Sequence, residues 1–188
     1  MSGDERSQRL PSGRHRLPDD LVERNQRERL VAAVAEACAE QGYAETSVAD
    51  LAKRAGVSTA TFYKLFGGKL ECGLEAHREL LERLLEEVDG ACGEAEGREA
   101  KLRTGIRTVL ELFAADPPTA RLLTAEVLAL GPAGSERNDA AIAAFAERSG
   151  AGWPLAAGAS MLIGKRVMAG EAARLPELED ELVALLSA

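Results

Sequence analysis

The sequence predicts an all-α protein in which a helix-turn-helix (homeodomain-like) head precedes a C-terminal helical bundle, the body. Alanine, leucine, glutamate and arginine are abundant, and these residues favour helices. Apolar residues recur at three- and four-residue spacings, and no long segment alternates as a strand does. With 188 residues, 46% of them hydrophobic, the chain can bury a core. We expect a polar tail at 1–20, a head at 21–68 and a body at 69–188.

The net charge of −8 is unevenly distributed along the chain. Residues 1–30 sum to +1, residues 31–69 are neutral, and the remainder carries −9. The acidic excess lies away from the predicted head, so the total charge does not exclude nucleic acid as a partner.

Residues 46–69 have the pattern of two short helices joined by a tight turn. Thr46 or Ser47 can cap the first helix, and Gly56 can end it in the left-handed conformation. The apolar face of this helix repeats at helical spacing. It consists of Val48, Leu51, Ala52 and Ala55.

Ser58 can cap the second helix, and Phe62 and Phe66 would lie one turn apart on its inner face. The outer face then carries small, hydroxylated, aromatic and basic side chains, which suit base edges and phosphates. They are Thr59, Ala60, Thr61, Tyr63 and Lys64. The alternatives are a solvated structural hairpin and a hairpin that holds another protein.

This stretch and the helix before it resemble the DNA-binding domain of the TetR family of transcriptional regulators. The resemblance covers roughly residues 24–75. It rests on Gly42-Tyr43, Thr46-Ser47-Val48, Leu51-Ala52, Ala55-Gly56-Val57-Ser58, Thr61-Phe62-Tyr63, Phe66 and Lys69.

The resemblance implies that Thr59, Ala60 and Thr61 approach bases and that a second set of residues fixes phosphates. That set is Thr46, Ser47, Tyr63, Lys64 and Lys69. The chain departs from the family at Leu65, where a histidine or tyrosine often contacts phosphate. We also count Ser58 and Arg27 as candidate DNA contacts, because Arg27 belongs to a basic cluster at the start of the helix predicted over 21–41.

A single recognition helix reads too few base pairs to select one genomic site. Two heads about 34 Å apart would match a palindromic operator, so we expect a homodimer on double-stranded DNA, most simply a repressor. The tail at 1–20 is either a solvated leader or a basic arm in the minor groove.

The remaining periodic segments predict helices over residues 69–89, 98–114, 117–130, 136–149, 155–174 and 176–186. Between them we expect a flexible joint at Gly67-Gly68 and a linker at 90–97. Ligand binding in the body would tilt the helix that begins at Lys69 and alter the spacing of the two heads.

A small apolar effector would bind among the body helices. The candidate pocket residues are His77, Phe113, Leu123, Phe145, Trp153 and Met161, although the same residues can simply fill the core. The candidate dimer interface lies on the last two helices, where small residues allow close approach. It consists of Ala156, Ala159, Ser160, Ile163, Val167, Leu182 and Leu185.

Enzymatic chemistry is not indicated, because the sequence has no glycine-rich phosphate loop, no metal-ligand spacing and no nucleophile–base pair. We expect no cofactor and no membrane span. The three cysteines fit a reducing cytoplasm: Cys38 is expected in the core, and Cys72 and Cys92 leave open a redox-sensing regulator.

Overall fold

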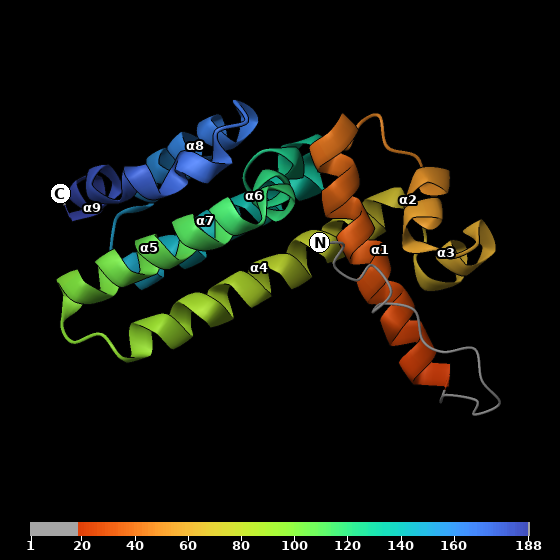
Figure 1. Ribbon diagram of the computed structural model, residues 1–188, viewed down its shortest axis with the longest axis horizontal. Helices are drawn as coiled ribbons and strands as arrows, with labels where there is room; N and C mark the ends of the chain where they lie inside the picture. Colours follow the sequence, from red (N-terminus) through yellow and green to blue (C-terminus); the bar gives the residue numbers. More distant parts are fainter. Residues whose placement is uncertain (1–18, 188) are drawn as a thin grey trace, which may run out of the picture.

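The computed structural model describes residues 19–187, and in this part of the chain every regular element is a helix (Figure 1). The head contains α1 (Asp19–Gln41), α2 (Val48–Ala55) and α3 (Thr59–Leu65). The body contains α4 (Lys69–Gly93), α5 (Arg98–Ala115), α6 (Pro117–Thr124), α7 (Pro132–Ser149), α8 (Trp153–Met168) and α9 (Glu179–Ser187). Two 3₁₀ helices, η1 (Glu126–Leu130) and η2 (Ala172–Leu178), complete it. The all-α prediction is confirmed, whereas the expected basic arm lies outside the described residues.

Local capping explains why the two short helices of the head begin and end where they do. Of the two candidates, Ser47 caps α2: its hydroxyl accepts the Asp50 N–H at 3.2 Å, and Asp50 accepts the Ser47 N–H at 3.0 Å. Gly56 ends α2 with φ of 63°, the left-handed conformation that glycine adopts without strain. Ser58 caps α3 by accepting the Thr61 N–H at 3.0 Å.

Helix α3 has seven residues, too few to be stable alone, and burial of its inner face holds it in place. Phe62 and Phe66 are almost fully buried, as predicted, with ring centroids 5.8 Å apart. The core around them also contains Leu122, Val127 and Leu130 from α6 and η1. The expected division between residues 68 and 69 therefore runs through a shared core.

The expected joint at Gly67-Gly68 is a structured connection rather than a loose one. The Gly67 N–H donates to Glu71 Oε2 at 2.7 Å, and α4 begins at Lys69 directly afterwards. Cys72 and Ala76, in the first two turns of α4, belong to the same core as Phe62. The head therefore packs against the first turns of α4 and is not joined to it only through a flexible linker.

The body is an elongated bundle in which α4 lies alongside α5 and α7, with α8 and α9 at the far side (Figure 1). A second core fills this bundle, with Leu110, Phe113 and Leu175 among its buried members. Arg103 and Arg107 on α5 hold Glu179 on α9 at 2.9 Å, and this pairing lowers the pKa of Glu179 to about 2.

Two of the predicted body helices end earlier in the structure than the sequence pattern indicated. The helix expected over 117–130 ends at Thr124, and the chain continues as η1. This change of direction buries Val127 and leaves Leu128 exposed. The helix expected over 155–174 ends at Met168, because Gly170 turns the chain with φ of 77°.

Three other boundaries differ from the prediction. Pro176 lies inside η2, so the last helix begins at Glu179. Helix α7 begins at Pro132 rather than at Glu136, because proline suits the first turn of a helix. Helix α4 extends to Gly93. None of the helices within residues 19–187 combines the length and apolar character that a membrane span requires.

His77 on α4 is a buried histidine with an unusual environment. Its side chain is 1% exposed, and neither ring nitrogen has a hydrogen-bond partner among the described residues. Burial, with a smaller contribution from Arg137, lowers the pKa of His77 from 6.5 to about 4. The unfolded chain therefore binds this proton more readily than the folded chain between these pH values.

We predict that the free energy of unfolding of the wild-type protein falls by about 3 kcal/mol relative to His77→Leu as pH drops from 6.5 to 4. Above pH 6.5 the variant should be at least as stable, because leucine leaves no buried nitrogen unpaired. Urea denaturation at several pH values measures both quantities. Parallel pH curves for the two proteins would contradict this account.

Candidate nucleic-acid interface and body cavity

The outer face of α3 is presented to solvent at one end of the molecule (Figure 1). Tyr63 is 60% exposed, and Thr59, Ala60 and Lys64 are exposed as well. Thr61 is half-buried, with its hydroxyl 2.9 Å from that of Ser58. The residues predicted to approach bases therefore lie together on an accessible face, framed by the exposed Ser47 at the start of α2.

Lys64 is paired within the head in this structure. Its Nζ donates to the carboxylate of Glu23 on α1, and this pairing raises the pKa of Lys64. Both side chains are largely solvent-exposed, so the pair is weak and readily exchanged. A DNA phosphate can take the place of Glu23 without uncovering any buried surface.

Thr46 and Lys69 are placed differently from the expectation that their side chains reach phosphates. Thr46 is 3% exposed, and its hydroxyl donates to the Gly42 carbonyl at 2.8 Å. Lys69 Nζ donates to the carbonyls of Tyr43 and Ala44 at 3.0 and 3.3 Å and lies 4.3 Å from the Tyr43 ring centroid. Both side chains fasten the turn between α1 and α2, which corrects their assignment as direct contacts.

Arg27 and Leu65 also contribute to packing within the head. The Arg27 guanidinium lies over the Phe66 ring, 4.9 Å from its centroid, an arrangement in which the ring face attracts the cation. Leu65, the position at which the chain departs from the resemblance described above, is buried and supplies core volume.

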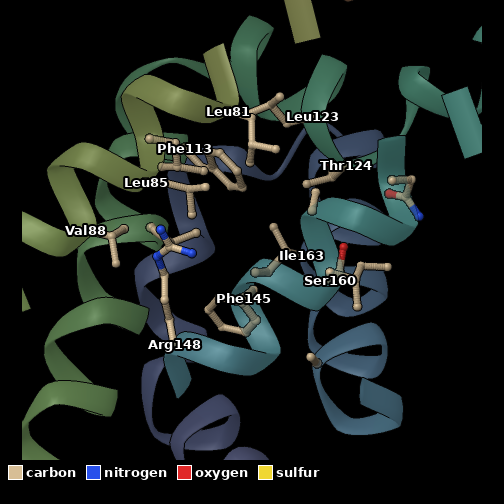
Figure 2. Close-up of a pocket in the computed structure, with 16 residues that line it drawn as sticks. Leu81, Leu85, Val88, Phe113, Leu123, Thr124, Phe145, Arg148, Ser160 and Ile163 are labelled. Atoms are coloured by element: carbon tan, nitrogen blue, oxygen red, sulfur yellow. The ribbon is translucent and has the colours of Figure 1, made fainter. Parts of the chain in front are cut away.

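The body contains a cavity between α4, α5, α6, α7 and α8, with a volume of about 80 Å³ (Figure 2). Its lining is mainly apolar: Leu81, Leu84, Leu85, Val88, Val109, Phe113, Leu123, Ala141, Ile142, Phe145, Ala156 and Ile163. Polar atoms come from Thr124, Asn138, Arg148 and Ser160. This volume would hold about six water-sized molecules, at roughly 10–15 Å³ each. A larger apolar ligand must therefore push the helices apart to enter.

A charged group lies at one side of this cavity. Arg148 on α7 extends toward Leu85 and Val88 (Figure 2) and is held by Asp89 on α4, with Nε and Nη2 at 2.9 and 3.1 Å from the two carboxylate oxygens. The Arg148 guanidinium lowers the pKa of Asp89. Because Asp89 is more than half exposed, another anion can compete with it for Arg148.

Some of the residues predicted to line an effector pocket lie at the cavity, and others do not. Phe113, Leu123 and Phe145 do line the cavity. Trp153 and Met161, by contrast, are exposed on the outer side of α8, and His77 is buried in packing outside the cavity. Arg148, Leu81 and Leu85 also line the cavity, although they were not among the predicted pocket residues.

The residues predicted to form a dimer interface face the interior of the chain and not its surface. Five of them are buried inside one subunit: Ala156, Ala159, Ile163, Val167 and Leu182. Ser160 lines the cavity, and Leu185 packs against the body core. The small side chains allow α8 to approach its own neighbours closely, as at Gly164, where an added Cβ would lie 3.2 Å from the Thr124 carbonyl oxygen.

The cysteines do not have the environment of redox sensors. Cys38 is in the core, as predicted, and Cys72 is equally buried; burial raises the pKa of both thiols to about 12. Cys92 is half-buried and its pKa is also raised. Thiolates are the reactive form, so none of the three is activated. Within residues 19–187 no group of histidine, cysteine and acidic residues could hold a metal ion.

Comparison with known proteins agrees with this geometry. Residues 30–76, which span the end of α1, all of α2 and α3 and the start of α4, match the family model "Bacterial regulatory proteins, tetR family". The chain is 25% identical over 122 residues to the HTH-type transcriptional activator FasR of Mycolicibacterium smegmatis. That match covers 65% of this chain and 56% of the relative, so it spans little more than half of the relative's length.

Solved structures share the fold of most of the chain. The fatty acid degradation regulator FadR of Bacillus halodurans superposes with a TM-score of 0.73 at 20% identity, covering 86% of this chain and 94% of that one. FadR of Bacillus subtilis, solved in complex with stearoyl-CoA, gives 0.68 at 22% identity, covering 85% and 97%.

Residues 30–76 therefore form a helix-turn-helix of the kind that the TetR family model describes, with capped α2 and α3 and an exposed outer face on α3. The all-helical body has the fold of the solved regulators named above.

We predict that Lys64→Ala flattens the dependence of log K on log salt by about 0.9 for each phosphate that this lysine neutralises. Glu23→Gln should instead strengthen DNA binding at low salt, because it frees Lys64 in the unbound protein. Fluorescence anisotropy with a duplex at several salt concentrations measures both effects. Unchanged slopes for Lys64→Ala would exclude a phosphate contact by this residue.

Proposed function

We propose that this protein is a homodimeric regulator that binds a palindromic operator and leaves it when an apolar or amphiphilic effector enters the body cavity. The exposed outer face of α3 supports DNA reading by Thr59, Ala60 and Thr61, with Ser47, Tyr63 and Lys64 near the phosphates. The observation that carries the effector is the apolar cavity between α4 and α8. Such a regulator acts on the chromosome, so we assign it to the cytoplasm.

The class of effector follows from the lining of the cavity. Its walls are almost entirely aliphatic and aromatic, which favours a hydrocarbon chain. Arg148 at the side of the cavity favours an anionic group at the other end of that ligand. The fatty acid degradation regulator of similar fold and the stearoyl-CoA complex support the same choice. We therefore propose a fatty-acid-derived amphiphile, whose polar end replaces Asp89 at Arg148.

A second copy of the chain would bind the outer face of α8. The residues on this face recur at three- and four-residue spacing, so they form one stripe. Trp153, Pro154, Met161, Lys165 and Met168 are exposed, and Ala157 and Gly158 between them are half-buried. Met161 is 69% exposed, and large apolar patches on the surface commonly mark interfaces. The proposed interface is thus on the opposite side of α8 from the residues that the sequence had suggested.

The sign of regulation has two candidates. Repression is the simpler, because ligand-driven release from an operator relieves a block. Activation is favoured by the relative of this chain that is named a transcriptional activator. A reporter placed behind the bound promoter, with the regulator present or deleted, separates the two.

The operator test is a gel shift with the DNA upstream of the protein's own coding region, followed by footprinting. We expect two protected half-sites about one helical turn apart. Addition of stearoyl-CoA or stearate should release the DNA, whereas hexadecane tests whether the anionic group is needed. Failure of the protein to protect any such site would contradict the proposal.

Filling the cavity should separate effector response from DNA binding. We predict that Ala156→Leu keeps operator affinity within about threefold but weakens the response to stearoyl-CoA at least tenfold, because the new side chain occupies the space the ligand needs. Ala143→Leu, on the exposed side of α7, is the matched control. Equal responses of Ala156→Leu and wild type would place the ligand elsewhere.

The interface prediction concerns assembly. Met161→Arg should convert the dimer to monomers at micromolar concentration, because it buries an unpaired charge. Leu128→Arg, at a leucine on η1 that is 53% exposed, should remain dimeric. Light scattering after size-exclusion chromatography gives the mass of each protein, and a dimeric Met161→Arg would remove α8 as the interface.

A further inference from the structure

Glu126 is the charged residue of η1 that reaches from the body into the head. Its side chain is 9% exposed. Oε2 accepts the Tyr43 N–H at 2.9 Å, across 83 residues of sequence. Oε1 accepts two donors from Arg121, Nε at 3.0 Å and Nη2 at 2.9 Å. A buried carboxylate is tolerated only with such partners, so its position is closely defined.

Arg121 completes the connection to the head. Its Nη1 donates to the Ala39 carbonyl at 3.0 Å, in the last turn of α1, and its other nitrogens hold Glu126. The carboxylate lies against Gly42, where an added Cβ would be 3.6 Å from both oxygens. We call these residues the head–body junction: Ala39, Gly42, Tyr43, Arg121 and Glu126.

The junction acts on the turn that begins the helix-turn-helix. The turn passes from Gly42 to Thr46, and Ser47 then caps α2. Lys69 at the start of α4 holds the carbonyl of Tyr43 from the other side. The orientation of α2 and α3 relative to the body is therefore set at this turn by one group from α4 and one from η1.

The same segment of chain forms a wall of the cavity. Leu123 and Thr124 line the cavity, and they lie between Arg121 and Glu126 in the sequence. Helix α6 is confined on its other sides: it packs against α1 (Figure 1), and the Thr124 carbonyl is in close contact with Gly164 of α8. A ligand larger than the cavity can enter only by moving parts of its wall, and this segment of the wall carries Arg121 and Glu126, which hold the turn after α1.

We propose that Glu126 is the positioning residue that transmits cavity occupancy to the recognition helices. This inference rests on the proposed effector site. Displacement of α6 shifts the carboxylate that holds the Tyr43 N–H, and the turn at Gly42 carries the shift into α2 and α3. In the dimer, this changes the distance between the two recognition helices and so the operator spacing that fits.

The test compares Glu126→Gln with Glu179→Gln. Glutamine at 126 keeps the size but presents an amide N–H₂ to donors, so it cannot satisfy both Tyr43 and Arg121. Glu179 also pairs with arginines, Arg103 and Arg107, but joins α5 to α9 within the body. Glu179→Gln therefore removes a comparable ion pair without touching the head.

The first readout needs no ligand. Amide hydrogen exchange over residues 39–46 should accelerate about tenfold in Glu126→Gln, as expected for loss of one buried hydrogen bond, and should be unchanged in Glu179→Gln. Unchanged exchange in Glu126→Gln would overturn the role of this residue at the turn, whatever the protein's effector.

The second readout distinguishes positioning from general stability. Operators with one base pair inserted or removed between half-sites should be discriminated by the wild type and bound more evenly by Glu126→Gln, with a reduced response to stearoyl-CoA. A uniform loss of affinity for all spacings, or an undiminished stearoyl-CoA response, would overturn the proposal. If the wild type itself ignores stearoyl-CoA and stearate, the effector proposal fails, while exchange and spacing still decide the role of Glu126.

Discussion

The burial of one apolar core that crosses from head to body is the constraint on which the rest of this structure depends. Helix α3 has only seven residues, and its place is fixed by Phe62 and Phe66. These rings share their core with Leu122, Val127 and Leu130, which belong to the body. Helix α6 thus contributes Leu122 to the core that holds the recognition surface and Leu123 to the wall of the cavity. A change in one cannot leave the other unaffected, because close-packed cores transmit displacement.

Hydrogen bonds between the head and the body fix the orientation of the head more closely than the apolar core does. Apolar packing allows sliding, whereas a hydrogen bond fixes the distance and angle between two atoms. The turn after α1 is held by Glu126 on one side and by Lys69 on the other. The resemblance to the TetR family implied a phosphate contact for Lys69, and in the structure this lysine holds the turn after α1 instead. This leaves Lys64, paired only with exposed Glu23, as the lysine of α3 available to DNA.

The sequence was sufficient for features that depend on local chemistry. Capping by Ser58, the left-handed Gly56 and the buried faces of α2 and α3 follow from residue type and spacing alone, and the structure has them as predicted. The all-α class followed from periodicity. The cavity was partly predictable, because Phe113, Leu123 and Phe145 are large apolar residues on inward faces.

Features that depend on contacts distant in sequence were not predictable. A helix over 117–130 is reasonable by propensity, but the chain leaves the helix after Thr124 and places Glu126 against Tyr43, 83 residues away. Helix α8 is apolar on both sides, so periodicity could not tell its inner face from its outer one. Ala156 and Ile163 proved to be inside, and Met161 and Met168 outside.

The mainly apolar wall of the cavity, with only Thr124, Asn138, Arg148 and Ser160 supplying polar atoms, has a consequence for what the cavity can discriminate. Hydrogen-bonding groups distinguish one functional group from another, but aliphatic walls chiefly measure size and shape. Phe145 and Ile163, with their neighbours, can tell a long chain from a short one more readily than a saturated chain from a close analogue of equal volume. Under the proposed function, such a wall would make the protein respond to a group of related compounds of similar size, so that it would report their combined abundance and not the presence of one of them.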